Sequence, residues 1–111
     1  MRRGEVWIAG DGRTDYAGKP RPVVVLQDDL FADTASVTIC PATSHDPGAA
    51  PIFRLRIEPD DVNGLDSVSF LMVDKVTTVR RATLADRIGS LTPEQMLALD
   101  RSLMVFLGLA R

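Results

Sequence analysis

The sequence predicts a small, mainly β protein that forms a β-barrel and carries one helix at its C-terminal end. Short runs rich in β-branched residues, such as Pro22–Leu26, alternate with segments rich in glycine and proline as far as Ser90. A strong helix signal then follows at Thr92–Gln95. A parallel α/β sheet would need a helix after most of its strands, and no such repeated helices are indicated, so the barrel is preferred.

The strands expected in the first half of the chain are short. Val6–Ala9 forms the first of them. Pro22–Leu26 is a continuous apolar run, as in a strand buried on both faces. Ser36–Cys40 forms the next strand, and Pro41 is expected to interrupt it. In all, about five to seven short strands are expected.

Residues 53–58 alternate apolar and charged side chains, which predicts a half-buried strand with its arginines facing solvent. Val68–Val73 and Lys75–Val79 form either two strands or one bent strand, and Arg87–Ser90 forms a short last one. The connecting segments are a surface loop at Gly10–Pro20, a single helical turn at Asp28–Ala32, a polar loop from Thr43 to Gly48, and a turn at Asp60–Asp66.

The C-terminal helix has clear signals at both ends. Thr92 supplies the N-cap, Pro93 the first helical position, and Gln95 the capping box. Gly108 offers a stop. The stripe expected to face the core contains Met96, Leu99, Leu103 and Leu107. Leu97 and Met104 lie off this stripe, so a partner subunit, or a C-terminal tail that packs back, is expected to cover a second face.

The composition is that of one ordinary globular domain spanning residues 1–111, with 45% hydrophobic and 25% charged residues. The chain has no apolar stretch of about 18 residues and no secretory signal, so no membrane span is expected. A lone cysteine, Cys40, favours a reducing, cytoplasmic location and is expected to be a small buried hydrophobe. No Cys/His cluster indicates a metal site, and no cofactor is expected.

The net charge is −2, from 13 basic and 15 acidic side chains. A general nucleic-acid coat is normally basic, because neutralising phosphates dominates non-specific affinity. Any nucleic-acid function would therefore depend on a local basic patch.

The order of several short motifs resembles the MazF/PemK/Kid toxin family. The motifs, given as the residues that begin and end each of them, are Arg3 to Trp7, Arg21 to Val25, Pro41 to Ser44, Ile88 to Glu94 and Leu107 to Leu109. Each motif alone is weak, but the series covers nearly the whole chain in the right order. The resemblance implies an SH3-like barrel of the CcdB/Kid/PemK type, a homodimer, and a cognate antitoxin. It also implies sequence-specific, metal-independent cleavage of single-stranded RNA, leaving 2′,3′-cyclic phosphate and 5′-hydroxyl ends.

The resemblance assigns catalytic roles to Arg21, Thr43 and Asp74. Arg21 and Thr43 match the family's residues at the scissile phosphate, and Asp74 falls where Kid has its proposed acid–base aspartate. At the next positions the chain departs from many relatives, with Lys75 in place of a glutamine and Thr77 in place of an arginine, and Met72 stands where Kid has a catalytic arginine. RNA-binding roles are expected for a larger set: Lys19, Ser44, His45, Arg54, Arg56, Lys75 and Arg80.

Each assignment has a plainer alternative. Arg21 suits a phosphate because its guanidinium stays charged and donates two parallel bonds, but it would also fit an ion pair with Asp28 or Asp29. Thr43 and Ser44 are equally typical of residues that cap a turn. His45 is the one side chain whose ordinary pKa lies near neutrality and is a candidate base, although an exposed loop histidine is more common.

The other charged residues also have plainer structural alternatives. Asp74 would fit an ion pair with Lys75, Arg80 or Arg87, and Lys75 would fit a solvated strand position. Arg54 and Arg56, with Arg80 and Arg81, would form the required basic patch if they converge near Arg21. Trp7 is expected in the core rather than stacked on a base.

Two other functions remain open from the sequence. One is a non-catalytic poison of gyrase on the same barrel, like CcdB, which would act through Leu107–Arg111. The other is an SH3-like interaction module. Its grooves are lined by aromatic side chains, and the aromatic fraction here is 5%, so this function ranks last.

Overall fold

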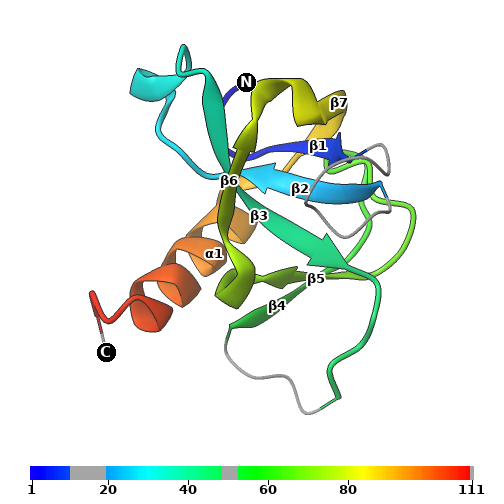
Figure 1. The fold of residues 1–111 in the computed structure, drawn as a ribbon. Coiled ribbons are helices and arrows are strands. Elements are labelled where there is room, and N and C mark those ends of the chain that lie inside the picture. Colours follow the sequence, from blue (N-terminus) through cyan, green and yellow to red (C-terminus); the bar gives the residue numbers. More distant parts are fainter. Residues whose placement is uncertain (11–19, 49–52, 111) are drawn as a thin grey trace.

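The structure is a computed structural model, and it describes residues 1–10, 20–48 and 53–110. Seven antiparallel strands and one C-terminal helix make up the architecture (Figure 1). The strands are β1 (Glu5–Ala9), β2 (Arg21–Val25), β3 (Ser36–Thr43), β4 (Arg54–Ile57), β5 (Ser69–Met72), β6 (Thr77–Arg80) and β7 (Leu84–Ser90), and the helix is α1 (Pro93–Phe106). The predicted fold class, mainly β with one C-terminal helix, is confirmed.

The strands pair in the order β4-β5-β3-β2-β1-β7, and β6 also pairs with β3. The central strand β3 has two partners on one side: residues 36–39 pair with β6, whereas Ala42 and Thr43 pair with β5. Within the described residues the ladder runs from β4 to β7 without closing on itself, and this curved sheet is compatible with the expected SH3-like barrel.

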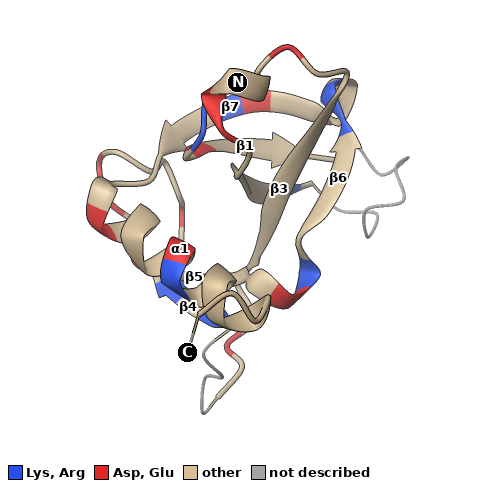
Figure 2. Cartoon of the chain, turned by 90° about the vertical axis from the view of Figure 1, so that its left-hand side faces the viewer, with Lys and Arg blue, Asp and Glu red and all other residues tan. Residues whose placement is uncertain are grey.

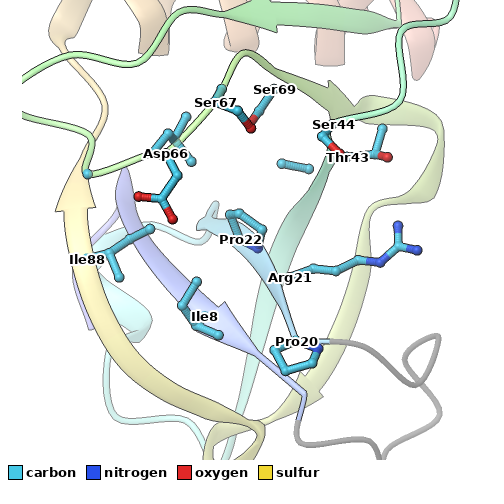
Figure 3. A pocket seen from close by; sticks show the side chains of 13 residues that line it. Ile8, Pro20, Arg21, Pro22, Thr43, Ser44, Asp66, Ser67, Ser69 and Ile88 are labelled. Carbon is cyan, nitrogen blue, oxygen red and sulfur yellow. The ribbon is translucent and has the colours of Figure 1, made fainter.

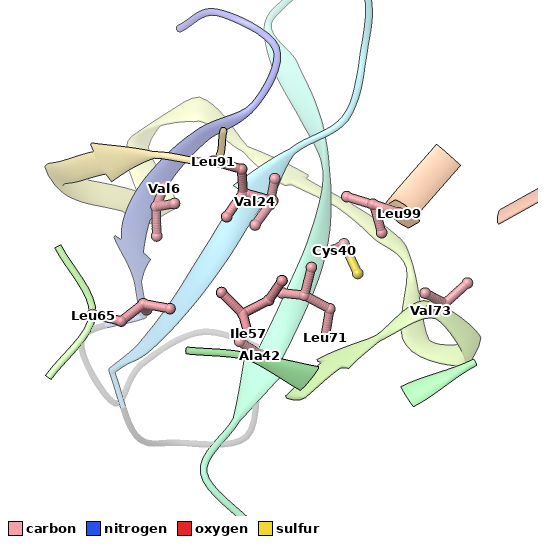
Figure 4. Close-up of a cluster of buried hydrophobic side chains, with 10 residues drawn as sticks. All are labelled: Val6, Val24, Cys40, Ala42, Ile57, Leu65, Leu71, Val73, Leu91 and Leu99. Carbon is pink, nitrogen blue, oxygen red and sulfur yellow. The ribbon is translucent and has the colours of Figure 1, made fainter. Parts of the chain in front are cut away.

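Both faces of the central strands are buried, as predicted for Pro22–Leu26. Val24 lies in one core cluster, together with Cys40, Leu71 and Leu99 (Figure 4). Its neighbours Val23 and Val25 point the other way into a second cluster with Val37, Ile39 and Leu84. Because side chains alternate along a strand, β2 and β3 each contribute to both cores. Trp7 packs partly buried against the second cluster, which agrees with a structural role.

In the described part of the chain, three short 3-10 helices connect strands: Asp29–Phe31, Val73–Lys75 and Arg81–Thr83. The first confirms the single turn expected near Asp28–Ala32. The second corrects the expectation of a strand starting at Lys75, because the chain turns at Val73–Lys75 before β6 begins at Thr77. The last strand is longer than predicted, starting at Leu84 rather than Arg87.

Helix α1 begins where the sequence predicted, but one residue of the stripe expected to be buried is exposed. The Thr92 hydroxyl accepts from the Gln95 amide, and the Gln95 side chain accepts from the Thr92 amide, which completes the capping box. Leu99 is fully buried, and Met96 and Leu103 pack partly buried against the core. Leu107, expected on the same stripe, is the C-cap residue after the helix ends at Phe106 and is 60% exposed. The described helix is too short to cross a membrane.

Candidate active site

Arg21 and Thr43 come together through the pairing of β2 with β3. In this antiparallel ladder Val23 lies opposite Pro41 and Val25 opposite Ile39. Continuing the same register by two residues brings Arg21, at the start of β2, opposite Thr43, at the end of β3. The two motifs that carry the resemblance therefore meet at one edge of the sheet.

Both residues line a pocket with a volume of about 410 Å³ (Figure 3). Its lining combines apolar side chains, such as Ile8, Pro22 and Ile88, with polar ones, such as Arg21 and Thr43. The full lining consists of Ile8, Pro20, Arg21, Pro22, Ala42, Thr43, Ser44, Gly64, Leu65, Asp66, Ser67, Ser69 and Ile88. Apolar lining with a few polar groups is typical of a small-molecule or nucleotide site.

Arg21 has no ion-pair partner among the described residues, and the pairing considered with Asp28 or Asp29 is not formed. The Asp28 carboxylate instead accepts from the Leu30 amide at 2.9 Å. Asp29 accepts from the Arg3 amide and pairs with the Arg2 guanidinium at 3.5 Å. Arg21 is half-buried and lines the pocket, and among the described residues its guanidinium has no competing carboxylate, so it can bind an anionic ligand.

Thr43 holds the turn that follows β3. Its hydroxyl oxygen accepts from the His45 amide at 3.1 Å, as in a turn-capping threonine. A hydroxyl that accepts still has its own hydrogen to donate, so the capping role leaves Thr43 able to bind a phosphate oxygen. Ser44 lines the pocket beside it, whereas the exposed His45 does not contribute to the lining.

Asp74 lies outside the pocket, in an ion pair with Arg54. The Arg54 Nε donates to Asp74 Oδ1 and its Nη2 donates to Asp74 Oδ2, both at 2.9 Å. The two side chains are 19% and 23% exposed, which corrects the prediction that Arg54 faces solvent. Lys75, Arg80 and Arg87, the pairing partners considered for Asp74, are not used; Arg87 pairs with Glu5 at 3.0 Å. Burial and, to a smaller extent, the Asp74 charge raise the pKa of the buried Cys40 thiol to about 12.

The remaining predicted RNA-binding cations do not gather around Arg21. Arg56 pairs with Glu58 at 2.8 Å, and Arg81 donates to the carbonyl groups of Ala32 and Thr34. The exposed side chains of Lys75 and Arg80 do not line the pocket, and Lys19 lies outside the described residues. Figure 2 shows basic and acidic positions interspersed over several elements, and Arg21 is the one Lys or Arg among the described residues that line the pocket.

One wall of the pocket was not singled out from the sequence: Asp66, Ser67 and Ser69, which follow the turn at residues 60–66. The Asn63-Gly64 pair signalled the turn, but nothing local indicated that it packs beside Arg21. The turn lies against β7, and a side-chain carbon on Gly64 would meet the backbone of Ile88. This contact joins residues far apart in sequence, which local patterns do not reveal.

A family model described as "PemK-like, MazF-like toxin of type II toxin-antitoxin system" matches residues 2–107. The match covers almost the entire chain, including both strands that carry Arg21 and Thr43. The chain belongs to this toxin family. The resemblance seen in the sequence motifs is therefore confirmed.

Known proteins of the PemK/MazF family are similar to this chain in sequence or in structure over nearly its full length. The probable endoribonuclease MazF of Mycolicibacterium smegmatis is 53% identical over 110 residues, covering 99% of both chains. The toxin MazF-mt6 of Mycobacterium tuberculosis has a similar structure, with a TM-score of 0.79, 26% identity, and 96% and 99% of the two chains covered. A mycobacterial endoribonuclease solved with its cognate antitoxin has a TM-score of 0.82 and 21% identity over 100% and 98% of the chains, which supports the fold.

Within residues 1–10, 20–48 and 53–110, no group of three or more histidine, cysteine, aspartate or glutamate side chains is placed to hold a metal ion. The independence of the reaction from metal stays a prediction, to be tested with a chelator.

Proposed function

We propose that this chain cleaves single-stranded RNA in the pocket between β2, β3 and the residue 60–69 segment. In this proposal the Arg21 guanidinium binds the scissile phosphate and Thr43 donates a hydrogen bond to one of its non-bridging oxygens. One observation carries the proposal: Arg21, which has no ion-pair partner among the described residues, and the Thr43 hydroxyl line the same pocket of about 410 Å³.

The class of activity follows from family membership and from a close relative. The relative that is 53% identical is named an endoribonuclease, and the family is one of toxins from toxin–antitoxin modules. Both findings bear out the prediction of an endoribonuclease toxin. They do not favour the gyrase poison or the SH3-like interaction module considered from the sequence.

The chemistry proposed needs no protein nucleophile. The ribose 2′-hydroxyl attacks the adjacent phosphorus, a base accepts its proton, and an acid protonates the departing 5′ oxygen. A fixed guanidinium stabilises the charge that develops on the phosphorane oxygens. The products would be a 2′,3′-cyclic phosphate and a 5′-hydroxyl. Asp74 and His45 stay predictions for the proton-transfer roles, since neither lines the pocket.

Two protein partners belong to the proposal. A cognate antitoxin is expected from the family, and an acidic segment that covers Arg21 would block the phosphate site. A homodimer is expected as well, because apolar side chains at the end of α1 are left exposed, including Met104 at 43% and Phe106 at 46%. A cytoplasmic location stays a prediction.

The test is incubation of the pure protein with long single-stranded RNAs in EDTA, followed by mapping of the ends. We expect discrete cuts ending in cyclic phosphate, reduced by at least about a hundredfold in Arg21→Ala. Arg101→Ala is the matched control, because it removes an equal charge from an exposed arginine on α1, outside the pocket and outside the predicted RNA-binding set. Cleavage by Arg21→Ala at the wild-type rate would exclude the proposed site, and inhibition of gyrase supercoiling without RNA cleavage would favour the rival poison.

A further inference from the structure

The pocket wall opposite Arg21 carries a carboxylate that the proposed cleavage chemistry does not use. Asp66 lines the pocket, and Figure 3 shows its carboxylate directed into the space near Pro22 and Ile88, away from the Arg21 guanidinium. No described residue forms a hydrogen bond or ion pair with this carboxylate. The exposed Asp66 carboxylate has no described partner, so it is available to accept hydrogen bonds from a ligand in the pocket.

The charges of the pocket orient a bound nucleotide. Arg21 attracts the phosphate, and Asp66 repels it. The apolar side chains of Ile8 and Pro22, which lie between these two residues in Figure 3, offer a surface for the flat face of a base. A nucleotide whose phosphate lies at Arg21 therefore directs its base toward Asp66.

An ionised carboxylate accepts hydrogen bonds and donates none, so it discriminates among bases by their donors. Guanine presents two neighbouring donors, N1–H and the N2 amino group, which match the two carboxylate oxygens. Adenine and cytosine each present one amino group beside a ring nitrogen that repels a carboxylate. Uracil presents one N–H between two carbonyl oxygens. Bases of single-stranded RNA expose these edges for such recognition.

We propose that Asp66 is a specificity-determining residue that selects a guanine next to the scissile phosphate. This inference rests on the proposed RNA-cleaving function and names the base that the same pocket prefers. The hydroxyl groups of Ser67 and Ser69 line the same wall; Ser69 donates to the Ser67 carbonyl at 3.1 Å, which leaves Asp66 as the charged acceptor of this wall.

The segment that carries Asp66 is held rigidly, as a selective contact requires. The fully buried Asn63 accepts from the Leu65 amide at 3.0 Å through Oδ1 and donates to the Glu58 carbonyl at 2.9 Å through Nδ2. The Ser90 amide donates to the Val62 carbonyl at 2.9 Å, which ties the turn to β7. The turn that leads into Asp66 is thus tied to the rest of the fold by hydrogen bonds.

The experiment measures binding separately from cleavage. The four nucleoside 3′,5′-bisphosphates of guanosine, adenosine, cytidine and uridine are titrated into the protein and followed by NMR. We expect the guanosine compound to bind at least about tenfold more tightly than the uridine compound. Asp66→Asn should reduce this preference about tenfold, Arg21→Ala should weaken all four alike, and Asp61→Asn, the same charge change at an exposed residue outside the pocket, should do neither.

Mapping of cuts in a randomised RNA pool completes the test. A guanine next to the cut in wild-type products, lost in Asp66→Asn while cleavage continues, is the expected result. Equal binding of the four bisphosphates, or an unchanged guanine preference in correctly folded Asp66→Asn, would overturn the inference and leave the ribonuclease proposal standing. Asp66-dependent guanosine binding without any RNA cleavage would instead count against the proposed function alone.

Discussion

The ion pair between Arg54 and Asp74 limits what Asp74 can do as a catalyst. Both carboxylate oxygens accept from one guanidinium, and both side chains are about four-fifths buried. We expect Asp74→Asn and Arg54→Gln to lower the free energy of unfolding by similar amounts, roughly 1–3 kcal/mol each. RNA cleavage by Arg54→Gln, which keeps the Asp74 carboxylate, should stay within a few-fold of wild type when assayed well below the melting temperature. Urea unfolding and initial cleavage rates measure the two effects.

The paired variants separate the two roles of Asp74. Arg54→Gln breaks the same ion pair and keeps the carboxylate, so it controls for lost stability. A large loss of cleavage in Asp74→Asn alone would establish the acid–base role that the family resemblance implies for this residue.

At the scale of elements, the turn at residues 60–66 can pack closely against β7 because two contact positions, Gly64 and Gly89, are glycines. A side-chain carbon on Gly89 would meet the backbone of Val62 and Asn63. We expect Gly89→Ala to lower the free energy of unfolding by roughly 2–4 kcal/mol, because backbone on both sides would have to move. Gly48→Ala is the control: it has open space and a φ of +78°, so only strain of about 1 kcal/mol is expected. Equal losses in urea unfolding would refute this account of the contact.

The same turn predicts a dependence of stability on pH. Amides of Asn63 and Val62 donate to the Asp60 carboxylate, at 2.7 Å and 2.8 Å, and lower its pKa. A carboxylate whose pKa is lower in the folded state stabilises the protein above its ordinary pKa, and this contribution is lost as the pH falls through the folded value. Wild type should therefore be more stable than Asp60→Asn at neutral pH, with the difference shrinking in acid. Melting temperatures measured from neutral to acidic pH test this, and Asp61→Asn should follow wild type.

Element boundaries show where sequence patterns stop being informative. The capping box of α1 and the doubly buried β2 were predictable, because both depend on neighbouring residues. The end of β3 was not: Pro41 was expected to interrupt this strand, yet β3 continues to Thr43. Pro41 lies at the step between the β6-paired and β5-paired parts of β3, where a residue without an N–H group fits. Only the long-range pairing of β3 defines that step.

For the whole molecule, the candidate site was predictable only in part, because long-range packing decides which residues line it. The resemblance identified Arg21 and Thr43, and the β2–β3 register joins them. Charge alternation in the sequence indicated cations on β4 and β6, but it could not show that Arg54 and Arg56 are paired with acids. Asp66 went unnoticed because its place in the pocket depends on how a turn packs against a distant strand.

The association state is the remaining expectation at this scale. Helix α1 exposes an apolar surface that includes Leu97 at 52% and Met104 at 43%, two turns apart on one face, and burying it would drive association. We expect wild type to have twice the mass of the 12.1 kDa chain by light scattering, and Met104→Glu to shift it toward the single chain. Phe31→Glu, at a 57% exposed position in a different turn, should leave the mass unchanged. A wild-type mass of 12.1 kDa at micromolar concentration would mean that this surface is covered by another partner, with the antitoxin the first to test.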